Sequence, residues 1–388
     1  MKILVNTIST KKNAGGAFQI AYNFLLKTLH YEDENIEWYY ITSSDLHEVL
    51  GSYFKEIINS HYFVFPTQPD YLGSYYRVKK CIRRIENDIH PDVVYSITAP
   101  SYFSFKTPEV MRFTNPWVTH PNNYSWSVLS QSSILKTKLY CWNQRRLMRK
   151  VHFFITQTET TKQGIIRITN VPSENVKVVS NVLPEAFASM DRSPVVDDEW
   201  INIACIGNPV PHKNIDIIPS VLLSLDRLDI KKVRFHTTIP FGHPLERKII
   251  DEVKSYGMFD RIVNHGRVSQ KELGDIYRKC QFCFLPTLLE VFSASTVEAM
   301  YYGLPIVATD FSFNREVLED SCLYFHPKNA NQAAVQISNL IKNTALQNVL
   351  RKKMEQRLSL YDNYDSHFKS IVEFLVKIGT NCSRIKKD

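Results

Sequence analysis

The sequence has no long apolar run and no cysteine framework, and both absences limit the class of protein. No window approaches the roughly twenty apolar residues that a membrane helix needs. The start, MKILVNT, goes directly into a strand pattern rather than a signal peptide. The seven cysteines lack disulfide spacing, and Cys280-x2-Cys283 has no second half. We therefore expect a cytoplasmic protein that is neither integral nor exported.

Two ligand motifs are also missing. Without a GxGxxG loop, a dinucleotide fold of the dehydrogenase kind is not supported. Without an Asp-x-Asp site, nothing evident would hold a catalytic metal. We expect neither a metal nor another cofactor.

The composition suits a globular protein of two domains. The chain has 388 residues, of which 44% are hydrophobic and 22% are charged. Its net charge of +8 is uneven, because residues 1–190 hold 21 Lys and Arg against 15 Asp and Glu, whereas residues 191–388 hold 26 against 24. The first half carries the basic bias.

Short apolar runs alternate with helical stretches along most of the chain. This alternation predicts α/β domains with parallel sheets whose two faces are both covered by helices. The predicted strands are Lys2–Thr7, Trp38–Thr42, Tyr62–Phe65, Val93–Ile97, Val110–Thr114, His152–Thr156, Val176–Val179, Ile201–Ile206, Val233–Thr238, Ile262–His265, Phe282–Leu285, Leu304–Thr309 and Cys322–Phe325.

A domain boundary is expected in the stretch Pro184–Glu199, which contains Pro, Ser and several Asp and lacks periodicity. This gives a first domain over residues 1–190 and a second over 191–363.

The most informative stretch runs from Phe282 to Asp310. An apolar strand closed by Pro286 is followed by a loop and then by Ser295-Thr-Val-Glu298, which has the spacing of a capping box. Gly303 and Pro305 would end that helix before the next strand. The unit places a helix amino terminus at the carboxyl edge of a parallel sheet, where ligands of such sheets bind.

A helix amino terminus offers free amides and partial positive charge to an anion such as a diphosphate. The amides of Phe292, Ser293 and Ala294 would form this site, with Glu290 before the helix and Glu298 in its first turn. Carboxylates are good acceptors for paired sugar hydroxyls. The pattern therefore suggests a nucleotide-sugar with one acid near each sugar ring.

Glu290-x7-Glu298, followed by Ala299-Met300 and Gly303-Leu-Pro305, resembles the signature of the group-1 family of retaining, nucleotide-sugar-dependent glycosyltransferases. The resemblance implies the GT-B fold, with two Rossmann-like doubly wound domains facing a central cleft. It also implies that a last helix, near residues 364–380, crosses back to the first domain.

The resemblance assigns roles to further residues of the second domain. Glu290 would contact the donor sugar and Glu298 the ribose. Lys213, after the strand at Ile201–Ile206, would grip the diphosphate, and Asn208 stands where the family has an Arg. Main-chain groups of Arg267 and Val268, after a Gly, would meet the nucleobase.

In the first domain, the resemblance implies that Gly15 and Gly16 form a loop that faces the cleft between the domains, where glycines let the backbone approach a ligand closely. His120 is the candidate for the His that the family places near the reacting carbon, with Asn115 as the competing alignment. This makes Glu290, Lys213 and His120 the candidate catalytic residues.

Two departures from the family pattern affect the donor site. Asn208 carries no charge, so one of two expected cationic contacts is missing. The family's Gly-Phe-Gly after the first Glu is replaced by Val291-Phe-Ser293, which stiffens the loop.

Two basic stretches lie in the first half, at Tyr75–Ile85 and Leu135–Lys150, and each mixes cationic with apolar residues at helical spacing. Such helices suit either an anionic membrane surface or a solvated helix face that packs its apolar side inward. No nucleic-acid motif accompanies them, so we expect no nucleic-acid partner.

The residues and the resemblance together predict a metal-independent retaining glycosyltransferase. It would move a hexose or related sugar from a nucleotide-sugar to a glycan or lipid-linked glycan, in bacterial surface-polysaccharide synthesis, in the cytoplasm or peripherally on the inner face of the cell membrane. A nucleotide-sugar epimerase and a non-catalytic scaffold subunit are the alternatives.

Overall fold

The computed structural model describes residues 1–12, 16–51, 53–54, 61–66, 74–98, 100–184, 187, 189–195, 199–361 and 363–385. The chain divides into two compact units. The first contains residues 1–120, 137–179 and 365–388, and the second contains residues 121–136 and 180–364. Within the described residues, no helix has both the length and the apolar character needed to cross a bilayer.

The first unit is built on a seven-stranded sheet in the order β3-β2-β1-β4-β5-β6-β7, in which every neighbouring pair is parallel. The near-continuous burial of the central strands explains why they read as plain apolar runs. The strands are β1 Lys2–Thr7, β2 Glu37–Ser43, β3 Tyr62–Phe65, β4 Val93–Ser96, β5 Glu109–Arg112, β6 Phe153–Thr156 and β7 Val176–Val178.

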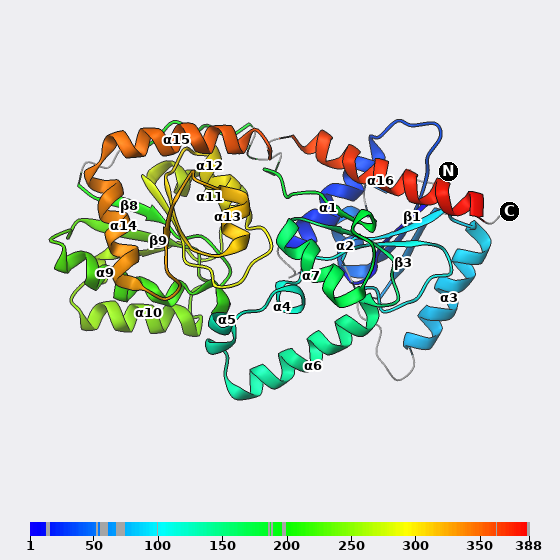
Figure 1. The fold of residues 1–388 in the computed structure, drawn as a ribbon, viewed down its shortest axis with the longest axis horizontal. Helices are drawn as coiled ribbons and strands as arrows, with labels where there is room; N and C mark the ends of the chain where they lie inside the picture. Colours follow the sequence, from blue (N-terminus) through cyan, green and yellow to red (C-terminus); the bar gives the residue numbers. More distant parts are fainter. Residues whose placement is uncertain are drawn as a thin grey trace. The chain divides into compact units, whose positions relative to one another are not determined.

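Helices cover both faces of this sheet (Figure 1). They are α1 Gly16–Leu29, α2 Ser44–Leu50, α3 Ser74–Ile89, α4 Pro116–Thr119, α6 Gln131–Met148 from residue 137 onward, α7 Glu159–Thr169 and the short η1 Ser173–Asn175. The long α16, Tyr364–Ile385, returns to this unit, where Phe368 packs against Phe24 and Trp38.

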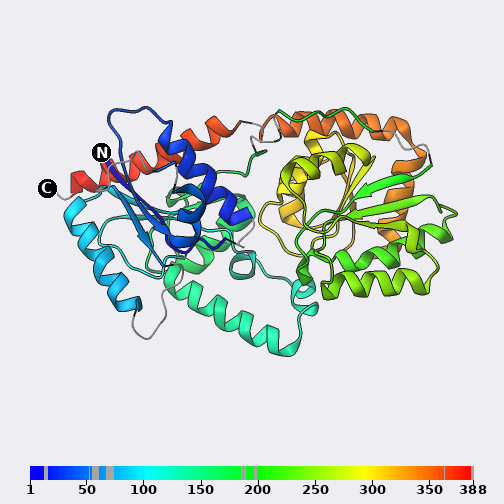
Figure 2. The same ribbon diagram turned by 180° about the vertical axis from the view of Figure 1, so that it is seen from behind.

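The second unit has a six-stranded sheet in the order β10-β9-β8-β11-β12-β13, again with parallel pairs throughout (Figure 2). The strands are β8 Ile201–Ala204, β9 Val233–Thr237, β10 Ile262–Asn264, β11 Phe282–Leu285, β12 Ile306–Thr309 and β13 Leu323–Phe325. All thirteen predicted strands are therefore present, with ends shifted by a few residues.

Two apolar clusters bury the two faces of this second sheet, one around Phe235 and Phe284 and the other around Cys283 and Val297. The helices that supply them are α9 Ile218–Arg227, α10 Pro244–Ser255, α11 Gln270–Lys279, α12 Ala294–Tyr301, α13 Ser312–Leu318, α14 Ala330–Lys342 and α15 Thr344–Leu358. Short turns of 3-10 helix occur at η2 Pro211–Lys213, η3 Ile215–Ile217 and η4 Phe259–Arg261, and α5 Asn123–Ser127 also belongs to this unit.

Each sheet has a point where the chain order reverses. In the first sheet this point lies between β1 and β4, and in the second between β8 and β11. The loops that leave neighbouring strands at such a point diverge and leave room for a ligand at the carboxyl edge. These two edges are where functional side chains are expected.

Candidate active site

The loops after β8 and β11 meet at the carboxyl edge of the second sheet. Leu288 donates its amide to the carbonyl oxygen of His212 at 2.8 Å, and the Asn214 side chain donates to the carbonyl oxygen of Pro286 at 3.2 Å. Asn214 adopts a left-handed conformation with φ 54°, which an Asn tolerates better than most residues. The two loops are thus held together at the reversal point.

Lys213 and Glu290 form an ion pair across these loops. The Lys213 Nζ donates to Glu290 Oε2 at 2.5 Å, and both side chains are largely covered, with 15% and 21% exposed. The other carboxylate oxygen accepts the amide of Val291 at 3.1 Å. The stem of Lys213 passes Gly207, whose missing side chain would lie 3.7 Å from the Lys Cδ. A cation and an acid predicted for the same ligand therefore neutralise each other here.

The charges of this cluster depend on one another. Burial alone would raise the pKa of Glu290, but the Lys213 ammonium and its hydrogen bond hold that pKa below its usual value. Burial lowers the pKa of the neighbouring His212 to about 4, and Lys213 adds to this although Glu290 opposes it. Near neutral pH the cluster contains one cation, one anion and a neutral imidazole.

The amino terminus of α12 lies beside this pair, but its capping differs from the prediction. The cap residue is Ser293, whose side chain makes no capping hydrogen bond, and the helix starts at Ala294. The predicted capping box of Ser295 and Glu298 is wrong. Ser295 instead donates its hydroxyl to the carbonyl oxygen of Ile206 at 3.0 Å, which ties the helix to the end of β8.

The first amides of α12 therefore keep their donor capacity. Among the described residues, no protein acceptor is assigned to the amides of Phe292, Ser293 or Ala294, as is usual for the first turn of a helix. Gly303, with φ +64°, follows the helix end as predicted. The helix thus offers an uncapped amino terminus next to Lys213.

Glu298 does not cap the helix because it is buried in the unit. Only 6% of the residue is exposed, and its carboxylate accepts the Tyr277 hydroxyl at 2.8 Å. Burial raises the pKa of Glu298 to about 7, although the hydrogen bond from Tyr277 and the charge of Lys213 act in the opposite direction. The carboxyl group of Glu298, which was predicted to contact the ribose, is thus already hydrogen-bonded to Tyr277.

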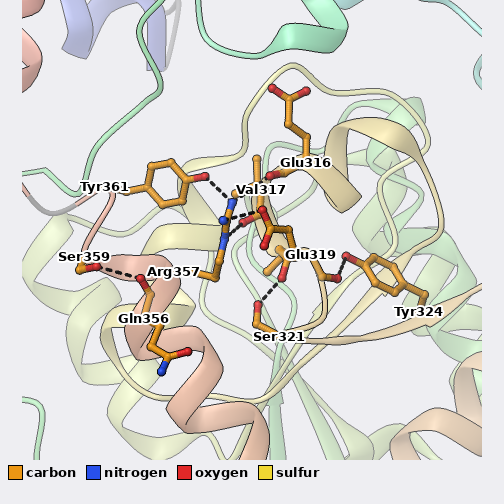
Figure 3. A network of polar contacts seen from close by, with 10 residues as sticks. Glu316, Val317, Glu319, Ser321, Tyr324, Gln356, Arg357, Ser359 and Tyr361 are labelled. Atoms are coloured by element: carbon orange, nitrogen blue, oxygen red, sulfur yellow. Dashed lines mark hydrogen bonds and ion pairs between the residues drawn. The ribbon is translucent and has the colours of Figure 1, made fainter.

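A polar network supports the site loop from outside the strands. Phe292 packs edge-on against Tyr361, with ring centroids 5.2 Å apart. The Tyr361 hydroxyl accepts from Arg357 at 2.9 Å, and the same guanidinium donates to Val317 O and Glu316 O and pairs with Glu319 at 2.7 Å (Figure 3). Arg357 thereby fastens the end of α15 to the end of α13.

The remaining predicted donor residues lie on neighbouring loops of the same edge. Asn208 is exposed in the loop after β8, and its carbonyl oxygen accepts the amide of Val210. Arg267 is exposed after β10, and Val268 packs against one of the two cores. Gly266, just before them, has φ +71°, a conformation that favours glycine.

The predicted residues of the first domain belong to the other unit. His120 ends the short α4, and its Nδ1 lies 2.8 Å from the Thr119 hydroxyl. Asn115 caps α4 by accepting the amide of Trp117, and it also donates to Gln144. Gly16 is the first residue of α1. Gly15 lies outside the described residues.

Three residues at the site were not selected from the sequence. His212 and Asn214 flank Lys213 and could have been found as polar neighbours of that residue. Tyr277 gave no such signal, because its spacing within α11 is that of a core residue.

Comparison with known proteins places this site in a family context. Residues 188–357 match the family model described as glycosyl transferases group 1. The chain is similar to the O-antigen chain mannosyltransferase RfbU of Salmonella typhimurium, with 23% identity over 57% of each protein. It is also similar to the serotype-specific mannosyltransferase WbdA of Escherichia coli, with 26% identity over 44% of this chain and 22% of that protein. The chain spans about half the length of the first curated relatives that it matches.

Solved structures show the same fold. HepE from Anabaena, crystallised with UDP and glucose, aligns over 97% of this chain and 99% of its own with a TM-score of 0.68 and 16% identity. Together with the two parallel sheets, this likeness confirms the predicted GT-B fold.

Proposed function

Since residues 188–357 match the family model of the group 1 glycosyl transferases, we propose that this protein transfers a hexose or related sugar from a nucleotide-sugar to a glycan or lipid-linked glycan. The relatives named above are mannosyltransferases, one of them for the O-antigen chain. Their names support a role in bacterial surface-polysaccharide synthesis. The family resemblance further supports transfer with retention of configuration.

The observation that carries this proposal is the Lys213–Glu290 pair beside the uncapped terminus of α12. A donor diphosphate would attract Lys213 away from Glu290, because it carries more negative charge than one carboxylate. Glu290 would then be free to accept hydrogen bonds from the hydroxyls of the donor sugar. Without a donor, Lys213 and Glu290 would therefore neutralise each other. With a donor bound, Lys213 would contact the diphosphate and Glu290 would contact the sugar.

The same groups account for leaving-group stabilisation without a metal. Charge that develops on the departing diphosphate would meet the Lys213 ammonium and the amides of Phe292, Ser293 and Ala294. Preorganised donors of this kind typically contribute a hundred- to a thousandfold to rate, or about 3–4 kcal/mol. Asn208 would add only a neutral contact.

Glu298 would contact the ribose with one carboxylate oxygen while the other keeps the hydrogen bond from Tyr277, because a carboxylate has two acceptor oxygens. Arg267 and Val268 would present main-chain groups to the base, and the first unit would bind the acceptor. Gly15 and Gly16 are candidate substrate-binding residues, and His120 is the candidate catalytic residue near the reacting carbon.

The helix α6 supports a peripheral position on an anionic membrane. Leu135, Leu139 and Trp142 repeat at the spacing of one helix face and are 71%, 65% and 60% exposed. Cys141 and Met148 lie buried on the opposite side. We refer to Leu135, Leu139 and Trp142 as the α6 apolar face.

The charge around the α6 apolar face fits the same partner. Between Glu109 and Glu159 the sequence has no acidic residue but seven basic ones. One of them, Arg112, is buried in β5, whereas Lys136, Lys138, Arg146, Arg149 and Lys150 are exposed. Each basic residue near an anionic bilayer contributes about 1 kcal/mol to binding. The inner face of a cell membrane would present both anionic lipids that attract these basic residues and a lipid-linked acceptor.

Calorimetry with UDP- and GDP-sugars, followed by an assay of acceptor-dependent nucleotide release, tests the proposal. We expect one donor to bind to the wild type, to bind more weakly to Lys213→Ala, and to be consumed only with an acceptor. Nucleotide release without an acceptor would instead indicate an epimerase. Binding of no donor would favour a non-catalytic subunit and overturn the proposal.

A further inference from the structure

Phe241 is the most exposed large apolar side chain in the described part of the chain, with 72% of the residue accessible. It lies in the loop between β9 and α10, at the same carboxyl edge of the second sheet as the candidate donor site. Phenylalanine usually contributes its large apolar surface to a core or an interface. The exposure of the Phe241 ring at an edge where ligands bind therefore suggests that the ring contacts a ligand.

The loop that carries Phe241 is firmly held. Gly242 donates its amide to Glu246 at 2.5 Å, and Glu246 is only 8% exposed. The Asn264 side chain accepts the amide of Ile239 at 3.0 Å and donates to its carbonyl oxygen at 2.8 Å. Because the backbone on both sides of Phe241 is fixed in this way, the point from which the ring projects is preorganised.

The ring lies directly over Gly266. A Cβ at this glycine would be only 2.5 Å from Cε2 of Phe241, so any larger residue would displace the ring. Asn264 also accepts the amide of Gly266 at 3.4 Å, which joins the loops after β9 and β10. Phe241 thus borders the backbone that leads into Arg267 and Val268.

The sheet order places this ring at a suitable distance from the diphosphate site. Neighbouring strands lie about 5 Å apart, and β9 lies between β10 and β8. Moving from the loop of β10 to that of β8 therefore covers about 10 Å along the edge. A ligand with a flat ring at one end and phosphates at the other can span these loops.

We propose that Phe241 stacks on the nucleobase of the donor nucleotide, an inference that rests on the proposed function. Every nucleobase has a π-face, and stacking on an aromatic side chain strengthens binding with little dependence on base identity. Arg267, exposed on the adjoining loop, borders the same face. Stacking would position the base, while main-chain groups after Gly266 would read its edge.

The test compares ligands with and without a base. UDP, GDP and inorganic pyrophosphate are titrated into the wild-type chain and into Phe241→Ala, Phe241→Trp and Phe259→Ala. Phe259 is the matched control, because it is 53% exposed but belongs to η4, which precedes β10 at the opposite edge of the same sheet. All of these side chains are exposed, so the variants should fold like the wild type.

We expect Phe241→Ala to weaken binding of the preferred nucleoside diphosphate about tenfold, in line with base–aromatic stacking, and to leave pyrophosphate binding unchanged. Phe241→Trp should keep the wild-type affinity, and its added tryptophan fluorescence should be quenched by the nucleotide. Phe259→Ala should bind every ligand as the wild type does.

The outcomes separate this inference from the proposed function. If Phe241→Ala binds the nucleoside diphosphate like the wild type, while Lys213→Ala does not, stacking is wrong and the donor site remains. An equal loss of pyrophosphate binding in Phe241→Ala also contradicts stacking, because pyrophosphate has no base. If the wild type binds neither nucleotides nor nucleotide-sugars, both proposals fail.

Discussion

The two units share one backbone plan but place different chemistry at corresponding points. In the second unit, the loops after β8 and β11 are bridged by the charged pair of Lys213 and Glu290. In the first unit, the loops after β1 and β4 are bridged by the hydroxyls of Thr10 and Thr98, 2.7 Å apart. The comparison shows that a reversal point fixes where a ligand can bind, whereas the side chains on its loops decide which ligand.

This difference agrees with the proposal that the second unit binds the donor and the first unit binds the acceptor. A cation and a helix terminus suit a diphosphate, and neutral hydroxyls suit an uncharged sugar.

Breaking the charged pair should have the largest effect. Lys213→Ala and Glu290→Gln are each expected to lower the transfer rate by a hundred- to a thousandfold, because each removes a group that acts on the diphosphate or the donor sugar. Transfer from the preferred nucleotide-sugar is the measurement.

The corresponding change in the first unit is the control. Thr10→Val with Thr98→Val removes both hydroxyls together, which leaves no donor or acceptor without its partner. Donor affinity should stay at the wild-type value. A loss of donor binding in this variant comparable to that in Lys213→Ala would contradict the contrast between the units.

In the described part of each unit, one acid has a raised pKa, which makes stability depend on pH. Burial raises the pKa of Glu109 to about 7, despite a hydrogen bond from Ser96, and that of Glu298 to about 7. An acid with a raised pKa in the folded state binds protons more tightly there than in the unfolded chain. The contribution of each of these two acids to stability is therefore largest below about pH 4.5 and falls as pH rises toward 7, by up to about 3 kcal/mol for each group.

Glu109→Gln isolates this effect in the first unit. The amide cannot ionise but can still accept the hydrogen bond from Ser96. Relative to wild type, the variant should gain stability at pH 8, by about 2 kcal/mol, and gain nothing near pH 4. Urea unfolding at the two pH values measures the difference. Equal effects at both would show that ionisation of Glu109 is not involved.

The two basic helices of the first half differ in a way that vesicle binding can test. In α3 the apolar residues Val78 and Ile82 are buried, whereas α6 exposes its apolar face. Changing Leu135, Leu139 and Trp142 to Ser should weaken binding to vesicles that contain anionic lipid by about tenfold or more, since each exposed apolar side chain that inserts adds about 1 kcal/mol or more.

Two variants calibrate that measurement. Tyr76→Ser removes the exposed aromatic residue of α3 and should bind vesicles like the wild type. Val349→Ser with Leu360→Ser removes exposed apolar side chains of the second unit and should do the same. Equal binding of the α6 variant and the wild type would rule out the α6 apolar face as the membrane contact.

The smallest effect is expected at the network behind Phe292. Arg357→Lys keeps the charge but cannot reach all of the acceptors that the guanidinium contacts, so stability should fall by about 1 kcal/mol. Thermal unfolding measures the loss. Lys353 lies on the same helix as Arg357 and forms an exposed ion pair with Asp320. Lys353→Ala should change stability little. A larger loss in the control would contradict the role given to Arg357.

The sheets were predictable because their central strands are almost entirely buried and so appear as short apolar runs. The sequence could not indicate that residues 121–136 pack with the second unit. That association depends on contacts such as Asn122 with the carbonyl oxygen of Leu288, which are 166 positions apart.

At the site, the sequence named Lys213 and Glu290 but not their ion pair, because their contact requires β8 and β11 to be neighbours in the sheet. The capping box failed for a related reason. Ser295 and Glu298 have the correct spacing, but the packing of α12 on α11 directs Glu298 to Tyr277. Local patterns identify polar groups, and the fold selects their partners.

The return of α16 to the first unit has a consequence for biosynthesis. Phe24 and Trp38 are made early, yet their contacts with Phe368, and those of their cluster with Leu375, wait until the ribosome has added more than three hundred further residues. The amino-terminal sheet must therefore leave an apolar strip uncovered while the second unit folds. During synthesis, this strip is where chaperones would be needed most.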